Sequence, residues 1–476
     1  MSDWQYRLVS AALLAALALP ALPAGAQTPA PPAQSPAPSG GAALPSIPDV
    51  PPVPLVGGGP LLTLADAVSA ALGQNFTIRL QALQVAIARA GVAQAQAGVQ
   101  PKVNFSGSYV YTWPADGGGS KPISGTTGGV PFTVVLPPAT NPLYTFGLSL
   151  SYPLYSGNAL QDQITIAQDA LKSAEAQLAA TIAQVILQVR QAYYQVQLTQ
   201  GQVGAAQRAV DAATENVRVT GARVQVGSSP QFDLLQAQAQ LAQFAQTLTQ
   251  AKANAVAAQQ SLDVVLNRPQ TTVASTSPLA LPEPPPDQEA LVQMAVRTRP
   301  ELAAAQATID AQRAAIDLAE AGLRPNVTIS GGPQIQTGDP TFKDAASWTG
   351  QILLTLAILD GGLTKARVDA ARQQLAVAET QEAQLRQTIE QQVRTAYLNL
   401  QNAAETLRSA ESQHVAASEQ LRIANVRFQA GVGTQLEVVN AQQGLATADQ
   451  AVVQAEYNYN LAIAQIEQAA GIRVQF

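Results

Sequence analysis

One uninterrupted stretch limits what this chain can fold into. From Leu363 to Ala430 the sequence contains neither glycine nor proline, and these helix breakers stand only at its ends, as Gly361-Gly362 and Gly431. The stretch is rich in Ala, Gln, Leu, Glu and Arg, which favour a helix. At 1.5 Å per residue, such a helix runs roughly 100 Å, about three times the diameter of a small domain. A compact globule cannot bury it, so the stretch predicts an elongated assembly.

The composition excludes several functional classes. The net charge is -6 and no basic stripe is visible, so nucleic acid is not an expected partner. The chain has no cysteine and a single histidine, His414, which excludes disulfides, zinc-type clusters and His-dependent catalytic triads. Phosphate-binding loop spacing is also absent. We therefore expect no enzyme, no catalytic residue, no metal and no cofactor.

The N-terminal segment has the features of a secretory signal. Arg7 is followed by an apolar run and by the small residues Ala24-Gly25-Ala26, so residues 1–26 are predicted to be a signal peptide. A membrane anchor is the alternative, but the run is short and contains prolines. Residues 27–61 are rich in Pro, Ala, Ser and Gly, which predicts a disordered leader.

Two segments of the first half alternate with the period of a strand. Residues 102–113 and 143–154 each place apolar side chains on one parity and small polar side chains on the other. The Gly/Pro-rich residues 114–142 between them are predicted to be a loop. Aromatic residues gather at the strand ends, as in an interfacial girdle that faces lipid. With one residue of the second half, the predicted girdle is Tyr109, Tyr111, Trp113, Tyr144, Tyr152 and Trp348.

The rest of the first half has the pattern of helices. Thr63 and Asp66 have capping-box spacing and open a short helix. Between residues 236 and 246 glutamine nearly alternates with apolar residues, but Ala and Gln favour a helix and β-branched residues are absent there. The predicted longer helices of this half are 77–98, 158–226 and 230–268.

The chain is an internal duplication. Val189-Arg-Gln-Ala-Tyr193 recurs as Val393-Arg-Thr-Ala-Tyr397, an offset of 393 − 189 = 204, whereas Pro101 matches Pro325, an offset of 224. The difference of 20 residues is assigned to the loop 114–142. We predict a first repeat at 62–277, a Pro-rich joint at 278–286 and a second repeat at 287–476. The second repeat is expected to contain strands 326–336 and 347–358 and helices 299–323, 362–430 and 434–470.

Four strands with one lipid-like face cannot close a membrane barrel, because about eight strands are the practical minimum. Open edges would expose unpaired backbone groups to lipid at a cost of several kcal/mol each. Three copies would instead supply twelve strands, continued by twelve long helical segments. Because the other strand face is small and polar, the lumen is expected to be wet.

These features together resemble the TolC-like outer membrane efflux proteins over residues 62–471. The similarity lies in the duplicated half, in Leu359-Asp360-Gly361-Gly362 after a strand, and in two Arg-x₃-Gly-x₅-Asp/Glu segments that start at Arg223 and Arg427. The resemblance implies a mostly α protein with a small transmembrane β part, built as a trimeric α-barrel plus a 12-stranded β-barrel. It also implies a homotrimer in the outer membrane that extends into the periplasm and contacts outer-membrane lipid.

The resemblance further implies a passive exit duct for small molecules in a tripartite efflux pump. Its partners would be a periplasmic adaptor protein and an inner-membrane transporter. The alternative within the family is the duct of a one-step protein secretion system. A soluble periplasmic coiled-coil scaffold would explain the helices without membranes, but it gives no reason for strands that alternate apolar with polar residues.

In this family the helix turns lie at the periplasmic tip, where the adaptor docks and the channel narrows. Docking then falls on Arg223, Val226, Gly227, Ser228, Arg427, Gly431, Val432 and Thr434, and the constriction on Phe428, Glu437, Asn440 and Asp233. Phe428 and Gly433 stand where the family often has a tyrosine and an arginine, and these two lack the groups of a hydrogen-bonded closure. A ring of Glu437 carboxylates would still favour cations. The alternative is structural, with both arginines and Gly227 and Gly431 as helix C-caps and Glu437 as a first-turn acid.

Overall fold

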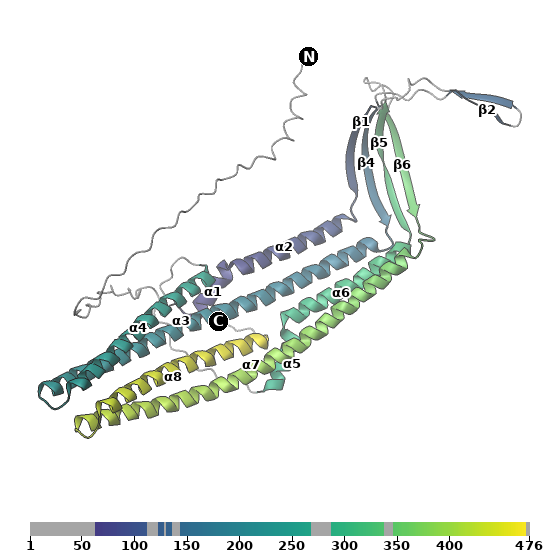
Figure 1. Ribbon diagram of the computed structural model, residues 1–476. Helices are drawn as coiled ribbons and strands as arrows, with labels where there is room; N and C mark the ends of the chain where they lie inside the picture. The colour runs from purple at the N-terminus through teal and green to yellow at the C-terminus, as the bar shows by residue number, and fades with distance from the viewer. Residues whose placement is uncertain are drawn as a thin grey trace, which may run out of the picture. The chain divides into compact units, whose positions relative to one another are not determined.

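The computed structural model describes residues 62–111, 122–127, 130–135, 143–267, 287–337 and 346–472. The predicted signal peptide, the Pro-rich leader and the Pro-rich joint lie outside these residues, and so does Trp113. Two helices of the described chain are far longer than the others. They are α3 (Ala159–Gln225) and α7 (Leu363–Gln429), and each turns back into a shorter helix, α4 (Gln231–Leu266) and α8 (Gln435–Ala469) (Figure 1). The predicted long helices and their return helices are confirmed.

The two offsets of the duplicated sequence recur in the helix bounds. Helices α3 and α7 both span 67 residues and start at Ala159 and Leu363, which differ by 363 − 159 = 204. Helices α1 (Leu64–Gln74) and α5 (Gln288–Thr298) both span 11 residues and differ by 288 − 64 = 224. Each is followed by a longer helix, α2 (Phe76–Ala97) and α6 (Pro300–Glu320). A 3₁₀ turn, η1 (Ala321–Leu323), completes the segment that the sequence predicts as one helix to 323.

A four-stranded antiparallel sheet joins the two halves of the chain. Its strands follow the order β1 (Lys102–Val110), β4 (Leu143–Tyr155), β5 (Asn326–Thr337) and β6 (Ala346–Thr355). The central pairing, β4 with β5, links the first half to the second. Both halves therefore contribute one central and one edge strand to the same sheet.

The helices follow the order of the strands. In the chain β1 is preceded by α2, β4 is followed by α3, β5 is preceded by α6 and β6 is followed by α7. The helices pack in the same spatial order, with α2 on α3, α3 on α6 and α6 on α7. The protomer is thus a strip of four strands continued by four helices. Its flanks are formed by β1 with α2 on one side and by β6 with α7 on the other.

Sharp turns connect the sheet to the long helices. Before α7, the Asp360 carboxylate accepts hydrogen bonds from the backbone N–H of Gly362 at 3.0 Å and of Thr364 at 2.7 Å. These bonds stabilise the carboxylate and lower the pKa of Asp360, with the Thr364 contacts as the largest cause. Gly361 and Gly362 have φ values of +66° and +88°, which a side chain would strain. Asp360-Gly361-Gly362 therefore ends the sheet and starts α7 within a few residues.

Two sequence predictions about the β segments were wrong in detail. The predicted loop 114–142 contains a two-stranded hairpin, β2 (Pro122–Thr127) paired with β3 (Val130–Val135). Gly128-Gly129 separates two short runs there, which is a hairpin signal that the Gly/Pro-rich composition concealed. The predicted strand 347–358 ends at Thr355, so its last residues form the approach to the Asp360 turn.

The largest apolar clusters lie where the short helices α1 and α5 meet the long ones. Val185, Val189 and Leu262 of one cluster are at most 1% exposed, and so are Ile389, Val393 and Ile466 of the other. Val189 and Val393 are equivalent positions of the two repeats. Within the described residues, none of the helices combines the length and the hydropathy needed to cross a membrane.

Candidate functional site

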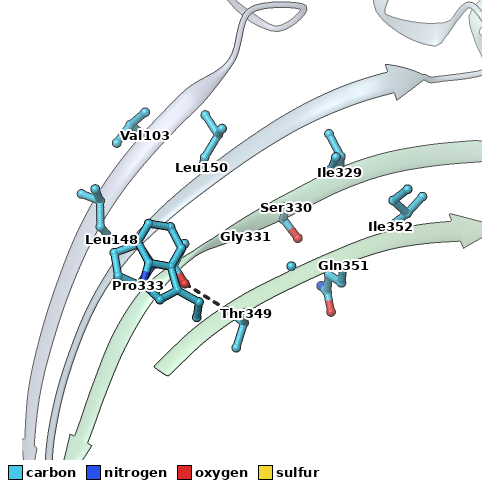
Figure 2. A pocket seen from close by; sticks show the side chains of 13 residues that line it. Val103, Leu148, Leu150, Ile329, Ser330, Gly331, Pro333, Thr349, Gln351 and Ile352 are labelled. Carbon is cyan, nitrogen blue, oxygen red and sulfur yellow. Dashed lines mark hydrogen bonds between the residues drawn. The ribbon is translucent and has the colours of Figure 1, made fainter. Parts of the chain in front are cut away.

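The sheet has one apolar and one polar face, as the alternating sequence predicts. The register places Val103, Leu150, Ile329 and Ile352 on one face, and Figure 2 shows them on one side of the strands with Thr349 and Gln351 on the other. The apolar face is open: Phe105 is 73% exposed, Trp348 81% and Ile352 68%. An exposed apolar surface of this extent indicates a contact with lipid or protein.

Aromatic side chains mark both ends of this face. Tyr109 and Tyr144 are paired in the register with ring centroids 5.2 Å apart, at the end of the sheet far from the helices. Tyr152 and Tyr155 lie at the helix-proximal end. Trp348 of β6 is paired with Pro333 and lies between the two ends, beside Leu148. Tyr144 and Tyr152 are eight residues apart on β4, and at ~3.3 Å per residue they are separated by about 26 Å. In a barrel whose strands tilt by about 40°, this length spans about 20 Å along the membrane normal, slightly less than the apolar band of about 25 Å in outer-membrane barrels. Tyr111 follows β1 and is exposed.

Glycines open a hollow in the middle of the apolar face. Gly331 faces Leu150 on one side and Gly350 on the other, so two adjacent positions carry no side chain. The hollow measures about 760 Å³, and its walls include Leu148, Ile329 and Ile352 (Figure 2). Strand β5 approaches β4 closely beside it, because a Cβ on Gly332 would lie 1.8 Å from the Leu148 carbonyl oxygen.

The sheet ends in two edge strands. Among the described residues, β1 pairs only with β4 and β6 only with β5. The outer edges of β1 and β6 therefore have backbone groups that no strand of the described chain pairs. Both edges border the apolar face, where lipid could not supply hydrogen bonds.

The α3–α4 turn contains the first group of predicted docking residues. Gly227 has φ +73°, and its N–H donates to the Val224 carbonyl at 3.0 Å. The backbone N–H and the hydroxyl of Ser228 donate to the Arg223 carbonyl at 2.8 and 3.0 Å. Val226 is 77% exposed at the turn. The glycine thus acts as a left-handed C-cap, and the turn presents an apolar side chain to its surroundings.

The α7–α8 turn repeats this geometry with an added ion pair. Gly431 has φ +76°, and the Arg427 carbonyl accepts from the N–H of Val432 and of Gly433, both at 3.0 Å. Thr434 caps α8 through its hydroxyl, which accepts from the Glu437 N–H at 3.3 Å. The Arg427 Nε donates to a Glu437 carboxylate oxygen at 3.2 Å. Glu437 is therefore both a first-turn acid and the ion-pair partner of Arg427 within its own protomer.

One contact joins the two turns. Arg223 of α3 donates from Nη1 to the backbone carbonyl of Phe428 on α7, and its guanidinium carbon lies 4.5 Å from the centre of the Phe428 ring. Phe428 is 5% exposed and packs with Ala424 and Val438. The ring is thus covered within the protomer rather than presented at a constriction. A backbone carbonyl and a ring face thus hold the Arg223 guanidinium.

The remaining predicted constriction residues lie within the first two turns of the return helices. Asp233 is half-buried in the first turn of α4, and Asn440 is exposed on α8. The cross-contacts above the turns could not be predicted from the sequence, because they join residues more than 200 positions apart. Two examples are the Gln442 amide, which donates to the Ala212 carbonyl at 3.1 Å, and Arg208 with Asp449. His414, a partly exposed residue of α7, also contacts Asp449.

Comparison with known proteins identifies relatives for most of the chain. The sequence model of the family described as outer membrane efflux protein matches residues 67–268 and 291–472. Nodulation protein T of Rhizobium leguminosarum bv. trifolii is 28% identical over 164 residues, 34% of this chain and 35% of that protein. The outer membrane efflux protein BepC of Brucella suis biovar 1 is 26% identical over 262 residues, 54% of this chain and 56% of that protein. The chain thus spans about a third to a half of these relatives.

A solved structure shows the same fold over a larger share of the chain. The outer-membrane channel OprN superimposes with a TM-score of 0.70 and 23% sequence identity, covering 86% of this chain and 89% of that one. At this level of identity the similarity establishes the arrangement of helices and strands.

Proposed function

Since this chain belongs to the outer membrane efflux protein family, we propose that it is the outer-membrane exit duct of an efflux pump for small molecules. On this proposal the duct itself is passive. The protein is placed in the outer membrane by its sheet and extends into the periplasm through its helices.

The observation that carries this proposal is the four-stranded sheet with an exposed apolar face and unpaired edges. Aromatic residues about 26 Å apart frame the face, from Tyr144 to Tyr152. On this proposal Tyr109, Tyr111, Tyr144, Tyr152 and Trp348 form the lipid-facing girdle, and Ser149, Ser330 and Gln351 of the polar face line a wet lumen.

The unpaired edges support a homotrimer. One protomer contributes four strands, fewer than the eight or so that a closed barrel needs, and three copies supply 3 × 4 = 12. Pairing β1 of one copy with β6 of the next satisfies both edges. The same operation brings α2 of one copy beside α7 of the next, because these helices continue the edge strands.

The helix turns are the proposed docking surface for a periplasmic adaptor, which would connect the duct to an inner-membrane transporter. Val226 and Val432 are 77% and 68% exposed at the two turns. Apolar side chains on exposed turns, held in place by Gly227 and Gly431, suit a protein partner. Glu437 and Asn440 remain the proposed constriction residues, with Glu437 favouring cations.

The function is tested by reconstitution and by deletion. Purified protein in a planar lipid bilayer should give stepwise ion conductance, and the deletion strain should become sensitive to small toxic compounds with its secreted proteins unchanged. Absence of conductance from folded protein would contradict the duct. Loss of a secreted protein without drug sensitivity would instead assign the duct to protein secretion. In the same recordings Glu437→Gln should weaken cation preference; an unchanged preference would leave Glu437 as a cap and ion-pair residue.

A further inference from the structure

Asp449 connects three helices from both halves of the chain. Its carboxylate, on α8, is only 8% exposed, and each oxygen contacts a different helix. Oδ1 lies 2.9 Å from Nε2 of His414 on α7. Oδ2 accepts hydrogen bonds from Nε and Nη2 of Arg208 on α3, at 3.2 and 3.1 Å. We call these three residues the Asp449 joint.

The joint lies where α3 and α8 are in close contact. Two turns from Arg208, Gly201 of α3 meets Val453 of α8 so tightly that a Cβ on Gly201 would lie 2.6 Å from the Val453 side chain. Towards the helix turns the same interface is polar, with the buried amides Asn216 and Gln442 facing each other. Polar contacts with defined geometry therefore hold α8 to α3 in this region. A change of charge on one of these side chains would alter how firmly the helix pair α7–α8 is attached to α3.

Other charged groups near His414 also depend on pH. Glu411 lies one turn before it on α7, and Glu456 lies two turns beyond Asp449 on α8. Burial raises the pKa of Glu456, and the negative charge of Glu411 raises it further. Arg408 and Arg422 pair with neighbouring acids of α7, Glu405 and Glu419. Of these groups, Asp449 contacts the imidazole directly and Arg208 binds the same carboxylate, whereas Glu411 and Glu456 lie one to two turns away along α7 and α8.

We propose that the Asp449 joint is a pH-responsive set of contacts that holds α7 and α8 to α3 more tightly in acid than at neutral pH. The neutral imidazole donates one ordinary hydrogen bond to Asp449. A protonated imidazole would give the buried carboxylate a second cationic partner beside Arg208. Protonation of Glu456 in acid removes its repulsion with Glu411. Since Glu411 is on α7 and Glu456 is on α8, this change also strengthens the contact between these helices in acid. The joint belongs to the folded protomer and does not rest on the proposed transport function.

Amide hydrogen–deuterium exchange tests the joint in the purified full-length protein. The exchange rates of peptides within 408–420 and 444–456 are measured for His414→Gln and for the wild type at pH 7.5 and pH 5.5. At each pH the rate of the variant is divided by the rate of the wild type, which cancels the intrinsic pH dependence of exchange. The glutamine keeps a hydrogen-bond donor but cannot become charged. We expect a ratio below about 2 at pH 7.5 and a ratio of about 5 at pH 5.5, as for a partly exposed ion pair.

Two further variants keep the test specific. Gln413→His in the His414→Gln background places an imidazole on the neighbouring position, turned away from Asp449, and should not restore protection in acid. Asp449→Asn should show no extra protection at pH 5.5, and peptides covering 185–196 report whether either variant still folds. Equal ratios at the two pH values would overturn the proposal, and so would restored protection in the Gln413→His variant.

Discussion

Arg190 and Arg394 are equivalent residues of the two repeats, yet they have different surroundings. Arg190 has a side chain only 8% exposed, and it contacts the Glu467 carboxylate and the Tyr194 hydroxyl. Arg394 lies 3.7 Å from Glu289, and both side chains are more than half exposed. Both arginines occur in the same Val-Arg-x-Ala-Tyr motif. The sequence predicts the duplication, but the burial of each arginine depends on which helices of the other half cover it.

This pair gives a prediction with an internal control. Glu467→Gln should destabilise the protein by about 3 kcal/mol, because it leaves the Arg190 guanidinium buried without its carboxylate. Glu289→Gln removes the exposed partner of Arg394 and should change stability by less than about 1 kcal/mol. The check is the apparent melting temperature of the detergent-solubilised variants. Equal shifts for both variants would show that the burial difference between the two arginines has no energetic consequence.

The helices were the most predictable elements. Helix α7 starts at Leu363, after two glycines, and α8 starts at Gln435, after a threonine cap, because breakers and caps act within a few residues. The site was less predictable. The contacts of Arg223 with Phe428 and of Arg208 with Asp449 join helices that are distant in the sequence, and helix periodicity contains no information on which helices become neighbours.

The Gly331-Gly332-Pro333 segment of β5 is visible in the sequence, but its role is not. Glycine and proline usually weaken a strand, yet β5 continues from Asn326 to Thr337. Gly332 permits the close approach of β5 to β4, and Gly331 permits its close approach to β6. Ser330 and Gln334 on either side keep the polar face of the sheet continuous across this segment.

Alanine substitutions at two glycines of the sheet should therefore have different effects. Gly332→Ala places a Cβ 1.8 Å from the Leu148 carbonyl oxygen, whereas a Cβ on Gly350 meets no atom within 4 Å. We expect Gly332→Ala to cost about 1–3 kcal/mol or more, since the strands must separate, and Gly350→Ala to be close to neutral. The check is the fraction of protein that migrates as folded barrel on unheated gels. Wild-type folding of Gly332→Ala would refute the close contact between β4 and β5.

The whole molecule has two flanks that must be covered together. One flank consists of β1 and α2, and the other consists of β6 and α7. On α2 the buried Val85 faces α3, and the opposite side of the helix carries an exposed apolar stripe of Phe76, Leu80, Leu83 and Ile87, each at least 53% exposed. Because α2 leads directly into the edge strand β1, one neighbouring copy can cover the stripe and the unpaired edge at once.

The last prediction tests that arrangement. Leu80→Lys puts a charge into the centre of the stripe and should convert a three-chain assembly into single chains, since burial of a leucine contributes about 1.5–3 kcal/mol at each of three interfaces. Ala86→Lys adds the same charge at an exposed position of the same helix, about 90° from the centre of the stripe, and it should leave the assembly intact. Light scattering after size exclusion in detergent gives the number of chains. If Leu80→Lys remains trimeric while Ala86→Lys dissociates, then α2 contacts its neighbour through a different side of the helix.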